Sequence, residues 1–130
     1  MKNLHKIILG VVMLFFCVSV AHAQKFTVSN VIIYDESPRY VQNKKNKALG
    51  TQVELTFFDE DVKVTIFDQD DGEPESEIFT KIDNNTYKLT YYSSEYCILY
   101  INRVLGYIKS ASLKYYTDDK LKTIVSLKRN

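Results

Sequence analysis

The sequence predicts an all-β fold: a single antiparallel meander of seven to eight short strands, closed into a small barrel or packed as a sandwich. Two observations carry this prediction. Apolar and polar residues alternate with a period of two over most of the chain, and clusters of Asp, Asn and Gly separate the alternating runs. In addition, no clear helix of about 10–15 residues separates the predicted strands, which argues against a parallel sheet.

The clearest hairpin spans residues 51–68. Asp59, Glu60 and Asp61 lie between two alternating runs and provide the turn. We expect the apolar positions of both runs to share one buried face. Those positions are Val53, Leu55 and Phe57, then Val62, Val64 and Ile66.

Two further hairpins and an opening strand complete the meander. By the same logic, one hairpin places Ile78, Thr80 and Ile82 on its buried face before a turn at 83–85, whose Asp and Asn side chains favour tight turns, and returns through 87–91. The other joins 111–115 to 121–127 across 117–120, and residues 26–34 form the first strand.

Two segments are less regular. Residues 37–50 contain Pro38, several lysines and two asparagines, so we expect mostly loop, with a short strand possible around Tyr40. Residues 96–107 are apolar on both faces, a pattern that fits a buried helix or a strand. Their aromatic and β-branched residues favour a strand, broken near Gly106.

The first 23 residues have the pattern of a cleaved signal peptide. A basic start is followed by an uncharged run from 7 to 21, and Ala21 and Ala23 provide small residues at the cleavage position. We therefore predict cleavage after Ala23 and export of one β domain, residues 24–130. A cysteine-poor exported chain favours a bacterial origin and a periplasmic or extracellular location.

The composition of residues 24–130 excludes several kinds of chemistry. This segment has no histidine, no tryptophan and one cysteine, Cys97, so a Ser-His-Asp or Cys-His site and an internal disulfide are both impossible. The apolar neighbours of Cys97 indicate a buried, inert thiol. A net charge of −1 gives no reason to expect nucleic acid as a partner. We expect no cofactor and no enzymatic activity, and membrane contact only through the signal peptide before cleavage.

The hairpin rhythm resembles that of lipocalin-like meanders and covers most of residues 24–130. The Gly-x-Trp motif near the first strand of lipocalins is missing, because this segment has no tryptophan. The resemblance therefore extends to the strand pattern, and we assign no family.

An acidic run at 68–77 allows two interpretations. It holds six carboxylates in ten residues, and Asp68, Asp70 and Asp71 could ligate calcium. However, Gly72 falls at the fifth position of such a loop rather than the sixth. We therefore favour a solvated hairpin turn. The run belongs to a wider charge asymmetry, with a net charge of −8 over 59–77 and +5 over 78–130.

Ten tyrosines lie in the exported segment, eight of them between positions 87 and 116. Adjacent aromatic residues of a regular strand point to opposite faces, so one member of each pair lies outside the barrel or under a second layer. The candidates for an exposed aromatic binding surface are Phe58, Phe67, Tyr92 and Tyr116.

These observations predict an exported, non-enzymatic binding or interaction module of the bacterial cell envelope. Its partner would be another protein or a small apolar or carbohydrate ligand, since tyrosine suits both. One alternative is an inhibitor or accessory subunit of another exported protein. A further alternative is a hydrolase that uses carboxylates alone.

Overall fold

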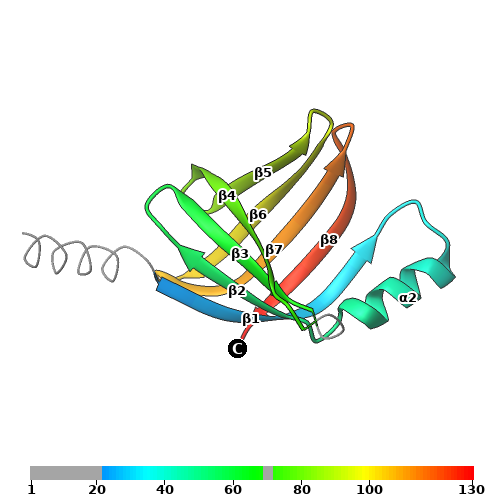
Figure 1. Cartoon of the computed structure of the whole chain (residues 1–130), viewed down its shortest axis with the longest axis horizontal. Helices are drawn as coiled ribbons and strands as arrows, with labels where there is room; N and C mark the ends of the chain where they lie inside the picture. The colour runs from blue at the N-terminus through cyan, green and yellow to red at the C-terminus, as the bar shows by residue number, and fades with distance from the viewer. Residues whose placement is uncertain (1–21, 69–71) are drawn as a thin grey trace, which may run out of the picture.

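The computed structural model describes residues 22–68 and 72–130 as a closed barrel of eight antiparallel strands with one helix beside it (Figure 1). Each strand pairs with the next along the chain, and β8 pairs with β1 to close the barrel. The predicted all-β meander is therefore confirmed, as a barrel rather than a sandwich. The elements are β1 His22–Ile33, α2 Pro38–Ala48, β2 Gln52–Phe57, β3 Asp61–Phe67, β4 Glu75–Asp83, β5 Thr86–Tyr92, β6 Glu95–Val104, β7 Tyr107–Thr117 and β8 Lys120–Arg129.

The meander gives the barrel two different ends. The end that we call the helical end carries α2 between β1 and β2, together with the β3–β4, β5–β6 and β7–β8 connections. The opposite end, which we call the turn end, carries the short β2–β3, β4–β5 and β6–β7 turns. Successive strands run in opposite directions, so the two sets of connections alternate along the chain.

The predicted strand pairings are confirmed at all three hairpins. Leu55 pairs with Val64 in the first, and Lys81 pairs with Tyr87 in the second. Asp118 and Asp119 form the turn of the third, with φ of 51° and 60°, the left-handed geometry that suits a two-residue hairpin turn. The segment 96–107 is also a strand that ends where predicted, since Leu105 and Gly106 turn between β6 and β7.

The prediction of a loop at 37–50 is wrong, because residues 38–48 form α2. The Ser37 side chain accepts a hydrogen bond from the Tyr40 backbone N–H, and Pro38 occupies the first turn. Lys45 and Lys47 lie in the last turn, where cations interact favourably with the helix dipole. These capping signals outweigh the weak helix propensity of Asn43 and Asn46.

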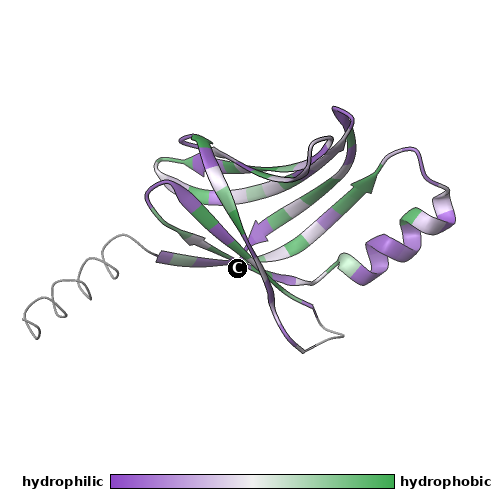
Figure 2. Cartoon of the chain, turned by 45° about the horizontal axis from the view of Figure 1, so that its top comes forward, coloured by the Kyte–Doolittle hydropathy of each residue, from purple (hydrophilic) through white to green (hydrophobic). Residues whose placement is uncertain are grey.

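Helix α2 buries none of its residues and is largely hydrophilic (Figure 2). Ala48 nevertheless packs against the core cluster from the last turn of the helix. In the part of the chain that the structure describes, no helix has the length and apolar character needed to cross a membrane.

The expected inward face of β4 is also wrong. Ile78 and Ile82 are 49% and 56% exposed, whereas Phe79 is buried. The register explains this, since Phe79 pairs with the buried Val62 and Glu77 with the buried Val64. The face of β4 that carries the buried Phe79 therefore continues, towards the helical end, with two exposed glutamates.

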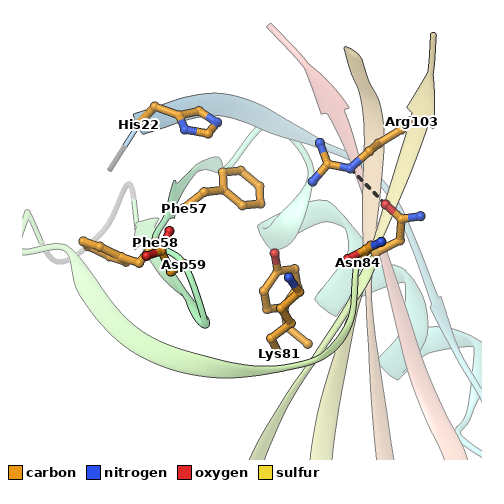
Figure 3. Close-up of a pocket in the computed structure, with 9 residues that line it drawn as sticks. His22, Phe57, Phe58, Asp59, Lys81, Asn84 and Arg103 are labelled. Atoms are coloured by element: carbon orange, nitrogen blue, oxygen red, sulfur yellow. Dashed lines mark hydrogen bonds between the residues drawn. The ribbon is translucent and has the colours of Figure 1, made fainter. Parts of the chain in front are cut away.

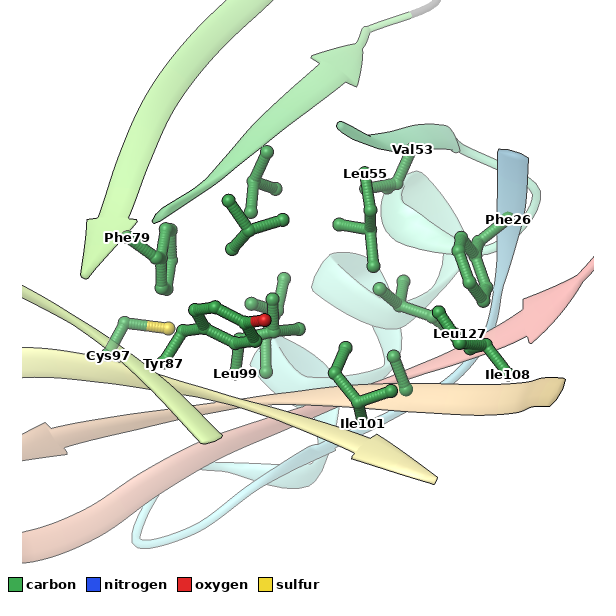
Figure 4. Close-up of a cluster of buried hydrophobic side chains, with 14 of the residues drawn as sticks. Phe26, Val53, Leu55, Phe79, Tyr87, Cys97, Leu99, Ile101, Ile108 and Leu127 are labelled. Atoms are coloured by element: carbon green, nitrogen blue, oxygen red, sulfur yellow. The ribbon is translucent and has the colours of Figure 1, made fainter. Parts of the chain in front are cut away.

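The barrel interior is filled by side chains from all eight strands (Figure 4). Its least exposed members are Phe26, Leu55, Leu99, Leu113, Leu127, Val62 and Cys97. The predicted burial of Cys97 is confirmed, and the thiol is free. Because every strand contributes to this core, the core fixes the strand ends at both ends of the barrel.

The hydrogen-bonded pairing between neighbouring strands is interrupted at two places near the helical end. β1 pairs with β2 only up to Thr27, then bulges near Ser29 and continues with β8 alone. α2 and Gly50 fill the space this opens, and the Gly50 N–H donates to the Val28 carbonyl at 3.0 Å. The β4–β5 ladder is also short and is confined to residues 80–83 of β4, near the turn end.

Candidate functional site

The helical end contains a hollow of about 460 Å³ between α2 and the barrel interior. It lies where β1 has left β2, so that the helix rather than a strand forms part of its wall. Its apolar surface comes from Val28, Val53, Ile66, Leu113, Tyr115 and Val125, and its remaining lining from Lys44, Lys47, Ala48, Thr51 and Asp68. An apolar concave surface with a few polar groups is the usual form of a small-molecule site.

A second, smaller hollow of about 40 Å³ adjoins the first on the β4 side. The two share Ile66, Leu113 and Tyr115. The smaller one is lined in addition by Val64, Glu75, Glu77, Phe79 and Tyr91. Two carboxylates and two tyrosines therefore lie beside the apolar surface.

A third hollow, of about 480 Å³, lies on the β1 and β8 side of α2. It shares Lys44, Ala48 and Val125 with the first. The Lys44 ammonium lies 5.6 Å from the centre of the Tyr40 ring, which lines this third hollow. Helix α2 thus contributes residues to both hollows.

Two tyrosines and a thiol at the helical end have raised pKa values. Burial raises the pKa of Tyr91 to about 12 and the pKa of Cys97 to about 12. Burial likewise raises the pKa of Tyr115, which is hydrogen-bonded to Cys97. The negative charge of Glu77 adds to the increase in pKa at all three groups, which places its carboxylate within electrostatic range of the interior.

The turn end has a pocket of a different character, with a volume of about 630 Å³ (Figure 3). Arg103 Nε donates to Asn85 Oδ1 at 2.9 Å, and the guanidinium lies 6.0 Å from the centre of the Phe57 ring. The pocket is lined by His22, Phe57, Phe58, Asp59, Lys81, Asn84, Asn85, Tyr87 and Arg103. Most of this lining is polar or charged.

His22 lines the turn-end pocket, so the shape of this pocket depends on whether the predicted signal peptide is cleaved. Its ring stacks on Phe57 with 5.3 Å between the centroids, and His22 pairs with Phe57 in the β1–β2 ladder. The predicted cleavage after Ala23 would remove this wall of the pocket, while the ladder from Gln24 to Thr27 would remain. The rest of the predicted signal peptide lies outside the described residues. We therefore take the helical end as the candidate site, since the residues that line its hollows all follow Ala23.

The four aromatic residues predicted to form a binding surface do not lie together. Phe58 lines the turn-end pocket, whereas Phe67 and Tyr92 end their strands at the helical end. Tyr116 lies on β7, where its ring stacks on Tyr96 with 5.0 Å between the centroids. Tyr92 is the most exposed of the four, at 72%.

The outer wall carries a separate aromatic and basic array over β5, β6 and β7. The Lys88 ammonium lies 4.4 Å from the centre of the Tyr96 ring, and Lys114 lies 4.8 Å from that of Tyr100. The Tyr96 hydroxyl donates to Asp119 Oδ1 at 2.9 Å, and this hydrogen bond raises the pKa of Tyr96. The tyrosines of this wall thus contact one another and neighbouring charged side chains.

Of the three predicted calcium ligands, Asp68 lines the larger hollow at the helical end. Asp70 and Asp71 lie outside the described residues. Within 22–68 and 72–130, no three His, Cys, Asp or Glu side chains group closely enough to hold a metal ion.

Glu75 and Glu77 are exposed, but they lie in β4 on the same face as Phe79, which the sequence analysis did not predict. The signal was available: both residues continue the period of two that starts at Phe79. Lys44 and Lys47 were missed because the helix that carries them was not predicted. No family model matches the chain, and no curated protein or solved structure is significantly similar to it.

Proposed function

We propose that this protein is an exported, non-enzymatic binding module of the bacterial cell envelope that holds a small, mainly apolar ligand at the helical end of its barrel. The observation that carries the proposal is the hollow of about 460 Å³ between α2 and the apolar residues of the barrel. The signal-like first 23 residues support export, and the absence of histidine from residues 24–130 argues against most catalytic sites.

The position of α2 supports a ligand in this place. An eight-stranded barrel has an interior wide enough to be filled by side chains or to hold one small ligand. Here the centre is packed, and the hollow begins only where β1 leaves β2. Because α2 buries none of its residues, moving it would cost little packing energy. The helix can therefore give way to a ligand while the barrel keeps its shape.

The test uses a neutral apolar fluorophore, N-phenyl-1-naphthylamine, which becomes brighter in apolar surroundings. The exported protein should bind it, and Ala48→Trp should abolish binding because the indole would occupy the hollow that Ala48 lines. Asn43→Trp is the matched control, on an exposed position of the same helix outside that lining. Equal binding by both variants, each folded by circular dichroism, would contradict the proposed site.

A second candidate function, an accessory subunit or inhibitor, is favoured by the tip of the β6–β7 hairpin. Leu105 is 93% exposed there, and Val104 and Tyr107 beside it are also exposed. An apolar tip that the barrel does not need for its core is suited to a protein interface. Native mass spectrometry of protein purified from its own compartment distinguishes the candidates. A retained small molecule supports the first, and a co-purifying protein that Leu105→Ser releases supports the second.

A further inference from the structure

The two charged side chains that line the smaller hollow have the same sign, and both are exposed. Glu75 and Glu77 share a face of β4 with the buried Phe79, and their partners across the ladder are Ile66 and the buried Val64. Both glutamates line the smaller hollow. Two carboxylates thus border a surface that is otherwise apolar and aromatic.

Aromatic side chains line the smaller hollow together with the two glutamates. Tyr91 and Tyr115 line the same hollow as the two glutamates, and Phe79 lies between them and the core. Aromatic faces attract cations, and a carboxylate forms charge-assisted hydrogen bonds with an N–H donor. Both tyrosines are uncharged at neutral pH, as phenols ordinarily are, and burial raises the pKa of each further. Their rings and hydroxyls are therefore available to a cationic group without competing ionisation.

The nearby lysines do not neutralise these glutamates. Among residues 22–68 and 72–130, the structure records no salt bridge to Glu75 or Glu77. Lys44 lines the larger hollow, and its ammonium lies 5.6 Å from the centre of the Tyr40 ring. Lys47 shares the rim of the larger hollow with Asp68, so the charge of that rim is mixed.

Given the ligand site proposed above, we infer that the ligand is an amphipathic organic amine. Its ammonium group contacts Glu75 and Glu77 beside Tyr91 and Tyr115. Its apolar part lies along Ile66, Leu113 and Val125 in the larger hollow. Because Ile66 and Leu113 line both hollows, one short-chain molecule can occupy the two together.

The experiment compares three probes that share one alkyl chain: octylammonium, 1-octanol and octanoate. Each is titrated against the fluorophore bound to the exported protein at neutral pH. We expect octylammonium to displace the fluorophore at about tenfold lower concentration than octanol, and octanoate to be the weakest. Glu75→Gln/Glu77→Gln should remove the preference for the amine and leave the affinity for octanol unchanged.

A control removes the same net charge elsewhere. Glu54→Gln/Glu60→Gln changes a residue of β2 that faces away from the core and one in the β2–β3 turn, and it should retain the preference for the amine. Loss of the preference in both double variants would show a general effect of net charge and overturn the inference. Glu77→Gln alone, the milder change, should reduce the preference in part.

Three results would overturn the inference in distinguishable ways. Equal displacement by octylammonium and octanol would refute the amine while leaving the proposed binding site intact. Tighter binding of octanoate would show that Lys44 and Lys47 set the specificity, and Lys44→Gln/Lys47→Gln would then abolish it. Failure of the fluorophore and of all three probes to bind would overturn the proposed function, and the amine with it.

Discussion

The two ends of this barrel pack on the same core, but they differ in the elements that form their walls and in the charged side chains that line their hollows. At the turn end, short hairpin turns close the strands, and the pocket presents Arg103 and Lys81 with two asparagines. At the helical end, α2 replaces a stretch of wall, and the smaller hollow is lined by Glu75 and Glu77 while Lys44 and Lys47 line the larger one. The turn-end pocket contains the hydrogen bond from Arg103 to Asn85, whereas the larger hollow of the helical end is lined by six apolar or aromatic residues of the barrel.

This difference shows how a packed barrel can retain a ligand site. The centre is filled by residues such as Leu55, Leu99 and Leu113, which leaves no room for a ligand. At the helical end, space arises where β1 bulges and separates from β2. A bulge of one residue thereby provides the place that α2 covers.

The largest expected effect is on the shared core. Leu55→Ala should lower the free energy of unfolding by about 2–5 kcal/mol, because Leu55 is fully buried and its removal leaves a cavity. Both ends should lose stability together in chemical denaturation. Glu54→Ala, on the opposite face of β2, should change the free energy by about 0.5 kcal/mol or less. Equal losses from the two variants would show that the strand faces are misassigned.

A smaller loss of stability is expected at alkaline pH, and its cause is the buried thiol of Cys97. Burial raises the pKa of Cys97 from 9.0 to about 12. Below pH 9 the thiol is protonated in both states, so stability is unaffected. Above pH 9 the unfolded chain loses this proton first, and the free energy of unfolding falls until the folded thiol ionises near pH 12.

The size of this loss is at most about 4 kcal/mol, and Cys97→Ala should remove it. Urea denaturation of both proteins between pH 7 and pH 11 gives the comparison. The wild type should lose stability more steeply than Cys97→Ala, with Tyr91 and Tyr115 accounting for a decline common to both, since the pKa of each is raised as well. Parallel curves would show that the thiol is accessible to water in the folded protein.

The smallest expected change in stability comes from a substitution at the turn end, which also tests at which end the ligand binds. Arg103→Ala removes the hydrogen bond to Asn85 and the contact with Phe57 at the turn end. We expect a loss of about 1 kcal/mol in stability, because the side chain is exposed. Binding of the apolar fluorophore should be unchanged. Loss of binding in a folded Arg103→Ala protein would place the ligand site at the turn end instead.

Most of the strand pairing could be predicted from the sequence, because alternation and turn residues act locally. The period of two at Val53, Leu55 and Phe57 indicates the buried face directly, and Asp118 and Asp119 favour the turn that they form. The face of β4 was predicted wrongly for an equally physical reason. Ile78 and Ile82 suggest one face and Phe79 the other, and only the register against β3 decides between them.

The helix could also have been predicted from its ends. Ser37, Pro38 and the lysines of the last turn form the usual capping pattern, but the segment has no apolar stripe to bury. Its position beside the barrel opening follows from the bulge in β1, which leaves no clear trace in the sequence. The hollow and its lining could therefore not be predicted from local pattern.

By itself, the sequence determined that this chain forms an antiparallel β meander, because alternation and turn preference depend on residues close together in the chain. It also predicts the signal peptide and the lack of histidine in the exported segment. Only the tertiary structure decided that the meander closes as a barrel, since closure depends on pairing β1 with β8 about a hundred residues away. The position of Glu75 and Glu77 on the same face of β4 as Phe79 was decided in the same way, because the direction of a side chain on an ambiguous strand follows from the register of its neighbour.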